Sequence, residues 1–424
     1  MGKVSSSNSQ GVHVPKLRFP GFEGEWNRVL FSDLFAYLSN NTLSRAELSN
    51  SGKVRNIHYG DVLIKYGEVI DIEHTEIPYV ADVSRLRKPD YLSTGDVVIA
   101  DTAEDDTVGK AVEIINNSSV AVVSGLHTIP CRPKKRFVPS YLGYYVNSAP
   151  FHTQLHPYMQ GIKVTSISKG NIGKTYISSP DLEEQQKITS LLNLLSSRIE
   201  KQRQLVEALK SYKRGALSKL FPKKGETTPE YRFAGFTEPW EQQKWCETVD
   251  MSKEMVDPRN GTYNNLPHVA PGNIESFTGR LFDNVKTVEQ EELISGKFHF
   301  HAGDIIYCKI NPQLGKYYFA QFEGLTSADA YVLKAKNGVI QDFLFAVLQT
   351  KDFFDYSVSV SKRSGMPKIN REELNAYLFL APSELEQEQI GAFLMHLDHL
   401  ISAQRSRIDE YERMKAGLLQ QLFI

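Results

Sequence analysis

Two short motifs contain residue types that could bind phosphate or a metal ion. Gly173-Lys174-Thr175 resembles the end of a phosphate-binding loop, but that loop needs a glycine where Ser168 stands. His299 and His301 are spaced to share one face of a strand. No third metal ligand stands close to them in the sequence, and histidines without a metal are far commoner. We therefore predict neither a nucleotide site nor a metal site.

The nearest matches to catalytic motifs in the chain are incomplete. Glu104-Asp105-Asp106 is not followed two residues later by a lysine, which a nuclease site built on acidic residues and a lysine needs. Asn311-Pro312-Gln313 lacks the second proline and the aromatic residue of an amino-methyltransferase motif. No glycine-rich dinucleotide fingerprint and no nucleophile elbow occurs. The chain is therefore expected to be a binding protein that is not catalytic by itself and has no cofactor of its own.

Composition limits the class of protein. The chain has 424 residues, 49 basic and 50 acidic side chains, and a net charge of −1, which argues against an indiscriminate polyanion binder. Three cysteines at irregular spacing favour a reducing compartment. No apolar run is long enough to cross a membrane, and no signal peptide follows the start. We expect a cytoplasmic protein without a membrane partner.

The chain repeats itself over most of its length. Residues 17–22, followed by Trp26, return as residues 231–236, followed by Trp240. A Gly-Asp-hydrophobic run and a Gly-Lys pair also occur twice, and a Glu-Gln motif at 184–185 returns at 386–387. The period is far too long for a solenoid. It predicts two copies of a whole domain, each followed by a helix.

Each copy ends in a long stretch with a heptad pattern. The seam of the first helix is predicted to contain Ile188, Leu192, Leu195, Ile199, Gln202, Val206 and Leu209, and that of the second Ile390, Leu394, Leu397, Ile401, Gln404 and Ile408. The polar exceptions match: Gln202 with Gln404, and Lys213 with Lys415. Two readings are open: each helix packs only on its own domain, or the two helices pack against each other as an antiparallel pair. The seams favour the second reading and a rod of roughly 50 Å.

The segments before the helices indicate mixed α and β structure. Predicted strands are 96–100, 111–115, 120–123, 304–308, 317–321 and 330–334. One helix per copy is predicted, at 140–147 and 341–350. The marks of the scaffold repeat while the loops differ, which is how one fold would present two different recognition surfaces.

The paired motifs resemble the specificity subunit (HsdS) of type I restriction–modification enzymes. The marks are Arg-Phe-x-Gly-Phe…Trp opening each half, the Gly-Asp runs, Pro-x-x-x-Glu-Gln-x-x-Ile at each helix start, and the Lys-x-Gly-x-Leu-x-x-Leu-Phe type tails. The resemblance covers residues 14–424 and implies an α+β fold. Two pseudo-two-fold-related mixed α/β target recognition domains would be separated by an antiparallel pair of long coiled-coil helices.

The resemblance divides the chain into six blocks. They are a disordered leader (1–13), target recognition domain 1 (14–180), spacer helix 1 (181–221), a linker (222–230), target recognition domain 2 (231–381) and spacer helix 2 (382–424).

In that family each domain reads one half of a split sequence in double-stranded DNA. The helices set the spacing, which we expect to be about five to eight unread base pairs. They also dock two modification subunits (HsdM) and restriction subunits (HsdR). S-adenosylmethionine, ATP and magnesium would then bind those partners.

DNA is read by side chains that reach base edges, while basic groups hold the phosphates. The candidates in the first domain are Arg55, His58, Tyr59, Lys110, Lys163 and Thr165, and in the second His268, Asn273, Lys309, Asn311, Lys316, Arg363 and Lys368. The plain alternative for each is an ordinary surface residue. The alternative for the whole chain is an assembly scaffold whose two domains bind only proteins.

Overall fold

The computed structural model describes residues 13–161, 164–362 and 365–424. Contacts group the chain into two units. Unit 1 contains residues up to Lys201 together with Arg407–Ile424, and unit 2 contains Gln202–Ser406. The predicted blocks treat the two long helices as separate pieces, whereas each helix is shared between the two units. Of the predicted leader, only His13 lies among the described residues.

Unit 1 is built on an antiparallel sheet extended by one parallel strand. Its order is β2-β11-β7-β9-β5, and β5 runs parallel to β9. The strands are β2 (Phe35–Tyr37), β11 (Thr128–Pro133), β7 (Val97–Ala100), β9 (Ala111–Ile115) and β5 (Val69–Asp71). A second sheet has the order β10-β4-β6-β3, with β10 (Val122–Ser124), β4 (Arg55–Ile57), β6 (Tyr79–Val80) and β3 (Leu48–Ser49).

Short elements complete unit 1. Two strand pairs are β1 (Asn27–Leu30) with β13 (Tyr176–Ser179), and β8 (Thr102–Ala103) with β12 (Thr165–Ser166). The helices are α1 (Phe31–Leu34), α2 (Tyr59–Ile64), α3 (Tyr141–Val146), α4 (Ala149–Leu155) and α5 (Lys169–Ile172), with 3₁₀ turns η1 (Arg45–Glu47), η2 (Val83–Arg85) and η3 (His156–Tyr158).

Unit 2 repeats the central sheet. Its order is β15-β23-β20-β21, made by β15 (Val249–Met251), β23 (Ala330–Ala335), β20 (Ile305–Cys308) and β21 (Tyr317–Phe319). This is the order β2-β11-β7-β9 of unit 1, so the duplication extends from sequence to strand topology. The predicted strands of both units match these elements to within two residues.

The second sheet of unit 2 has the order β16-β19-β22-β17-β18. Its strands are β16 (Met255–Val256), β19 (Lys297–Phe300), β22 (Gly324–Thr326), β17 (Pro267–Val269) and β18 (Lys286–Thr287), and β14 (Glu241–Lys244) pairs with β24 (Leu378–Ala381). The helices are α7 (Trp245–Thr248), α8 (Gln341–Val347), α9 (Lys351–Val360) and α10 (Arg371–Asn375), with 3₁₀ turns η4 (Pro258–Asn260), η5 (Pro271–Asn273) and η6 (Pro312–Leu314).

The expectation of one helix per copy before the long helices was wrong. The predicted helices are α3 and α8, but α4 and α9 follow directly. In α9, Phe353, Tyr356 and Val360 recur at helical spacing and pack on the core of unit 2. The aromatic-rich segment there is therefore a helix with one apolar face.

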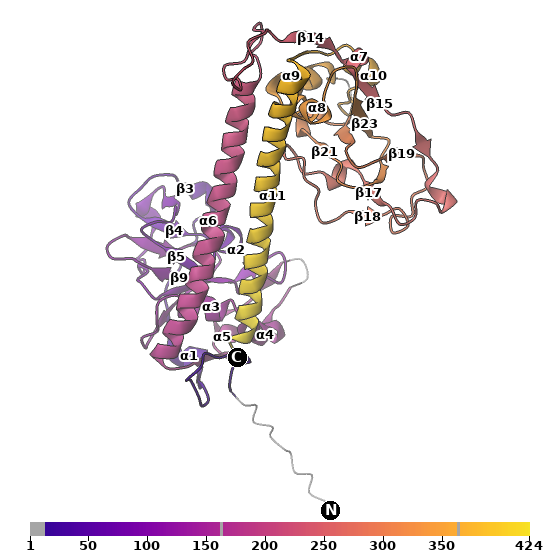
Figure 1. Cartoon of the computed structure of the whole chain (residues 1–424). Coiled ribbons are helices and arrows are strands. Elements are labelled where there is room, and N and C mark those ends of the chain that lie inside the picture. Colours follow the sequence, from indigo (N-terminus) through magenta and orange to yellow (C-terminus); the bar gives the residue numbers. More distant parts are fainter. Residues whose placement is uncertain (1–12, 162–163, 363–364) are drawn as a thin grey trace, which may run out of the picture. The chain divides into compact units, whose positions relative to one another are not determined.

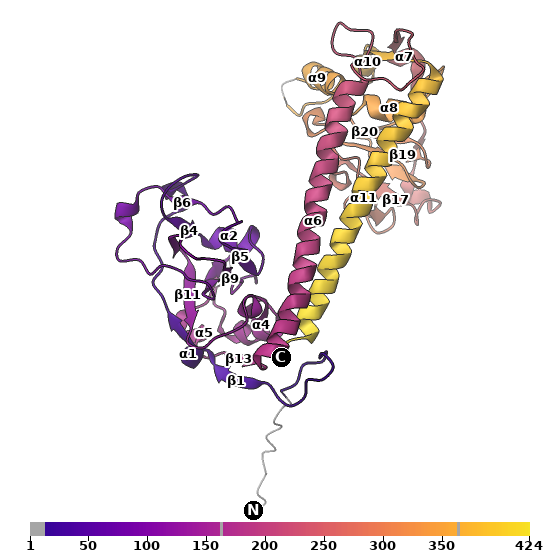
Figure 2. The ribbon, with the colours of Figure 1, turned by 60° about the vertical axis from the view of Figure 1, so that its left-hand side comes forward.

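The long helices are α6 (Leu182–Leu220) and α11 (Glu384–Gln421). Unit 1 contains residues 182–201 of α6 and residues 407–421 of α11. Unit 2 contains residues 202–220 of α6 and residues 384–406 of α11. In both views these stretches lie side by side within each unit (Figures 1 and 2). At a rise of 1.5 Å per residue, the 39 residues of α6 span about 58 Å.

Every predicted seam residue is buried or half-buried. Among the described residues, the side-chain oxygens of Gln202 and Gln404 are buried without a hydrogen-bond partner. Each of the seam lysines instead has an acidic partner. The Lys213 ammonium contacts Asp398 at 2.5 Å within unit 2, and the Lys415 ammonium contacts Glu68 at 2.5 Å within unit 1.

A buried ion pair joins the opening segment of each unit to its long helix. In unit 1 the Arg18 guanidinium donates two hydrogen bonds of 2.8 Å to Glu184, in the first turn of α6. In unit 2, Arg232 donates bonds of 2.9 and 2.7 Å to Glu386, in the first turn of α11. The two glutamate side chains are 2% and 1% exposed. This pair accounts for the arginine and the glutamate in the two repeated motifs.

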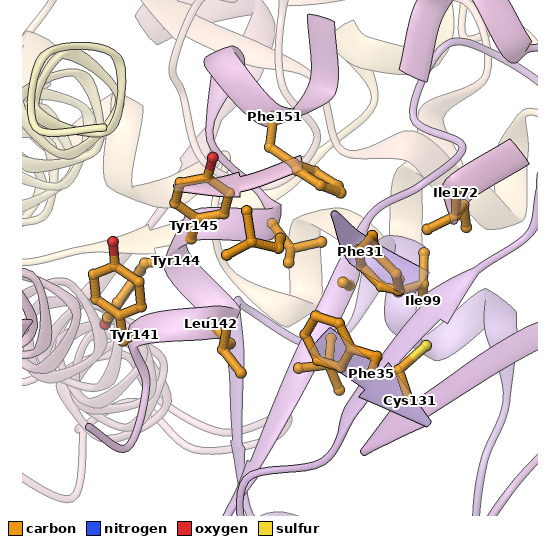
Figure 3. Close-up of a cluster of buried hydrophobic side chains, with 14 of the residues drawn as sticks. Phe31, Phe35, Ile99, Cys131, Tyr141, Leu142, Tyr144, Tyr145, Phe151 and Ile172 are labelled. Carbon is orange, nitrogen blue, oxygen red and sulfur yellow. The ribbon is translucent and has the colours of Figure 1, made fainter. Parts of the chain in front are cut away.

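The residues that directly follow each long helix complete the core of a unit. In unit 1 the Phe423 ring packs edge-on against Trp26, and in unit 2 the Phe221 ring packs edge-on against Trp240. Tyr141 and Tyr145 of α3 also contact Phe423 and lie in the aromatic core of unit 1 (Figure 3). Thus the start of α6 and the end of α11 both belong to the core of unit 1.

Removing the carboxylate of Glu184 tests the ion pair. Glu184→Ala leaves the Arg18 guanidinium partly buried without its partner, so we expect a loss of about 3 kcal/mol in the free energy of unfolding, measured with urea. Glu183→Ala, at an exposed position one residue earlier, should change it by less than about 0.5 kcal/mol. Equal losses in the two variants would show that the pair does not hold the segment.

Glu113 of β9 makes the stability of unit 1 depend on pH. Its buried carboxylate accepts 2.8 Å hydrogen bonds from the backbone of Ser140 and Gly143, and burial outweighs them and raises its pKa from 4.5 to about 7. The folded state therefore holds a proton that the unfolded state releases between these values.

We expect the protonated Glu113 to contribute about 3 kcal/mol to the free energy of unfolding. This stabilisation should be fully present below pH 4.5 and should be lost as the pH rises through 7. Glu113→Gln should remove that part of the pH dependence. The measurement is the difference between the two proteins in urea unfolding from pH 4.5 to pH 8. Parallel curves would contradict the assignment to Glu113.

Candidate functional site

Two equivalent loops carry the polar groups of the candidate sites, one in each unit. They follow the equivalent strands β7 and β20, starting at Asp101 and Lys309. An equivalent backbone hydrogen bond fixes the first residue of each loop. The Ile167 amide donates to the Asp101 carbonyl, and the Ile369 amide donates to the Lys309 carbonyl, both at 2.9 Å. The two loops therefore begin from the same backbone frame.

In unit 2 this frame gathers positive charge, and we call Lys309, Lys368 and Arg371 the basic cluster. The Lys309 ammonium lies 5.5 Å from the centre of the Tyr331 ring, and the Arg371 guanidinium lies 5.3 Å from it. Burial lowers the pKa of Lys309, and the charges of Lys368 and Arg371 lower it further. A bridge between Ile310 and Lys368 holds the two loops together.

Arg371 is a member of the basic cluster that the sequence did not point to. Its two terminal nitrogens donate to the carbonyls of Met251 and Ser252 at 3.0 and 2.7 Å. Its charge therefore has a fixed position beside Lys309 and the exposed Lys368. The only signal in the sequence is a repeated basic residue: Lys169 and Arg371 occupy equivalent positions in the two halves, and each is the first residue of a short helix, α5 or α10.

In unit 1 the same frame carries acidic and neutral groups, and we call Tyr59, Asp101, Thr102 and His127 the polar cluster. Thr102 donates to Asp101 at 2.8 Å, and the His127 ring lies 3.4 Å from the same carboxylate. The Tyr59 ring packs edge-on against His127. Asp101 thus stands where unit 2 has Lys309, and the two sites have opposite charge at one equivalent position.

Two other predicted residues lie in or beside these loops. Thr165 is on β12 and pairs with Ala103, so it adjoins the polar cluster. Asn311 lies two residues beyond Lys309 in a left-handed conformation, with a φ of 48°, and its backbone amide donates to the Pro367 carbonyl at 2.8 Å. Lys163 and Arg363 lie outside the described residues. Their assignment to DNA contact stays a prediction.

The remaining candidates have internal hydrogen-bond partners. Arg55 donates to the Ile72 carbonyl, and the buried ring of His58 accepts from the Gly60 amide at 3.2 Å. His268 is buried and lies 2.5 Å from the Glu291 carboxylate, and burial lowers its pKa. Asn273 is buried and accepts from the Ala270 amide at 2.7 Å. These contacts give the four side chains a structural role inside their own units.

Lys110 and Lys316 are a matched pair of anchors. The Lys110 ammonium donates to the Leu63 carbonyl at 2.7 Å, and the Lys316 ammonium donates to the Pro271 carbonyl at 2.6 Å. Both acceptors lie on the helical turn that follows the strand of Arg55 or His268. The repeated Gly-Lys motif therefore ties this turn to the central sheet in each unit.

The family model described as "Type I restriction modification DNA specificity domain" matches residues 23–210 and 252–413. The chain belongs to this family. It contains two specificity domains, one match for each half of the repeat. No helix in the described part of the chain is long and apolar enough to cross a membrane.

Two relatives in sequence agree with the family, and a solved structure shares the fold. The chain is 28% identical over 258 residues to the type I restriction enzyme EcoDI specificity subunit of Escherichia coli, which covers 54% of this chain and 56% of the relative. It is 21% identical to the putative MjaX specificity subunit of Methanocaldococcus jannaschii, over 83% of each chain. A crystal structure of a type I S subunit from M. genitalium has the same fold, with a TM-score of 0.61, 11% identity, and coverage of 97% of this chain and 99% of that chain.

We expect Lys110→Met and Lys316→Met to act on stability. Each substitution keeps most of the side chain but removes a charged hydrogen bond to a partly buried carbonyl, which should cost about 1.5–3 kcal/mol. Thermal unfolding of the full chain measures the loss. Lys351→Met, at an exposed lysine paired with Asp355, is the control and should leave the melting temperature nearly unchanged. Unchanged stability with weakened DNA binding would instead make the two lysines DNA contacts.

Proposed function

We propose that this chain is the sequence-specific DNA-recognition subunit of a type I restriction–modification complex. Each specificity domain reads one half of a bipartite target, and the long helices set the spacing between the halves. The observation that carries the proposal is the pair of equivalent loops with different charge, because one scaffold with two different surfaces suits two different half-sites.

Charge supports DNA as the ligand of unit 2. The basic cluster places two cations, Lys309 and Arg371, over the Tyr331 ring, and the exposed Lys368 adds a third positive charge beside Lys309. Grouped lysine and arginine side chains bind phosphates and displace counterions. The polar cluster of unit 1 offers hydrogen-bonding groups of histidine, threonine, tyrosine and aspartate. An aspartate can accept from the exocyclic amine of cytosine, so unit 1 is suited to base contacts more than to phosphate contacts.

The chemistry of the complex is assigned to other chains. We propose that this chain is non-catalytic, and that the helices dock two HsdM subunits and, through the complex, HsdR subunits. S-adenosylmethionine, ATP and magnesium would bind those partners. The protein-only scaffold remains the rival, and it predicts no difference between specific and scrambled DNA.

Mapping of methylated adenines in host DNA would first define the target. The complex of this chain with its modification subunits should then bind that duplex more tightly than a duplex with either half scrambled. Scrambling one half-site of the duplex should weaken binding, while the domain that reads the other half-site should keep its contacts. Equal affinity for target and scrambled duplexes would overturn the proposal in favour of the scaffold.

The basic cluster makes a sharper test of the same complex. Replacing both Lys309 and Lys368 by alanine should lower affinity for all DNA and reduce the slope of log K against log salt by about 1.8, since each phosphate contact contributes about 0.9. Lys244→Ala is the control, because Lys244 is exposed and pairs with Glu247. A slope unchanged by the double substitution would remove the basic cluster from the interface.

A further inference from the structure

One face of the second sheet in unit 2 carries two histidines beside each other. His299 lies on β19 and His301 directly follows that strand, so their side chains point to the same side. Their ring centres are 4.5 Å apart. The His299 side chain is 10% exposed and the His301 side chain is 51% exposed, so one ring is held by its surroundings while the other meets solvent.

The strand register brings a carboxylate to the same face. Strands β19 and β22 are antiparallel, with Phe300 opposite Gly324. One step further along both chains places His301 opposite Glu323. The Nε2 atom of His299 lies 2.7 Å from Oε1 of Glu323. One ligand atom from each of His299, His301 and Glu323 lies within 4.8 Å of the other two.

Two further carboxylates stand behind the histidines. The Nδ1 atom of His299 lies 4.0 Å from Glu254, which comes just before β16 on the neighbouring strand. The Nδ1 atom of His301 lies 3.8 Å from Asp304, which also accepts from the His301 backbone amide at 2.8 Å and lies 3.4 Å from the Lys334 ammonium. In metal centres the ligating histidine commonly presents its second nitrogen to a carboxylate, which orients the ring and raises its basicity.

We propose that His299, His301 and Glu323 form a binding site for a divalent transition metal ion such as Zn²⁺. Two imidazoles and one carboxylate are a ligand set that zinc accepts, and three protein ligands leave a coordination position for water. The ion would take the place of the proton between His299 and Glu323, and its charge would be balanced partly by Glu254 and Asp304. The inference does not rest on the proposed function.

Such a site would stabilise a particular part of unit 2. His299 and His301 come from β19 and the turn after it, and Glu323 from the turn between β21 and β22. The ion would therefore link two strands of the β16-β19-β22-β17-β18 sheet at one end. Because these ligands are folded into position, binding to the native state should raise the melting temperature.

The test is a titration of the full-length chain with Zn²⁺ alone. Calorimetry should show one equivalent bound with release of protons, and thermal unfolding should occur at higher temperature in the presence of Zn²⁺. Co²⁺ in place of Zn²⁺ should give the visible absorption of a cobalt–imidazole site. His301→Ala and Glu323→Gln should each weaken binding by roughly tenfold or more, because each removes one of three ligands.

Two controls separate this site from other histidines. His74→Ala removes an exposed histidine that pairs with Asp71 in unit 1, and it should leave Zn²⁺ binding unchanged. His396→Ala removes a histidine on α11 that stands three residues from His399 and should also have no effect. Circular dichroism and melting without metal check that His301→Ala is folded.

The proposal is overturned if the wild-type chain binds no Zn²⁺. It is also overturned if folded His301→Ala and Glu323→Gln bind Zn²⁺ as the wild type does, or if His396→Ala alone abolishes binding.

Discussion

The buried arginine–glutamate pair is the constraint on which the arrangement of each unit depends. A guanidinium and a carboxylate taken out of water are stable together only with close bidentate geometry and further hydrogen bonds. Arg18 with Glu184, and Arg232 with Glu386, meet that requirement. The next residue in each case, Gln185 or Gln387, accepts a backbone hydrogen bond from residues just before α3 or α8. The first turn of each long helix thus holds the opening segment on one side and the globular unit on the other.

The other end of each long helix imposes a second constraint. Unit 1 needs Phe423 to cover Trp26, and unit 2 needs Phe221 to cover Trp240. A backbone bond accompanies each contact, from Leu17 to the carbonyl of Gln421 and from Tyr231 to the carbonyl of Lys219. The core of unit 1 therefore contains residues from both ends of the chain. Closing so long a loop costs chain entropy before these contacts form, so we expect unit 1 to complete its folding only after Phe423 is made.

The repeated scaffold also explains how two units can differ in recognition. The hydrogen bonds from Ile167 and Ile369 fix the same backbone at Asp101 and Lys309, while the side chains there have opposite charge. Recognition can change at such a position without cost to the fold, because the side chain is not what holds the loop. Lys110 and Lys316 behave in the opposite way. Their ammonium groups donate hydrogen bonds to carbonyls inside each unit, and both copies therefore have a lysine at this position.

The sequence by itself determined the duplication, the two long helices with their seam, and most strands of the central sheets. These features depend on periodicity and on motifs that recur along the chain, and both can be read without knowing any distance in space. It also placed Lys309, Asn311 and Lys368 among the candidates. It did not reveal α4 and α9, because the apolar face of α9 becomes evident only where it packs on the core of unit 2.

Only the tertiary structure decided what each polar side chain does. His58, Asn273, Lys110 and Lys316 look like surface recognition groups in the sequence, yet each has a hydrogen-bond partner inside its unit. Glu323 stands 22 residues after His301 and reaches it only through the register of β19 and β22. The reason is physical: the role of a charged or polar group is set by its burial and by neighbours within a few ångströms, and those neighbours come from distant parts of the chain.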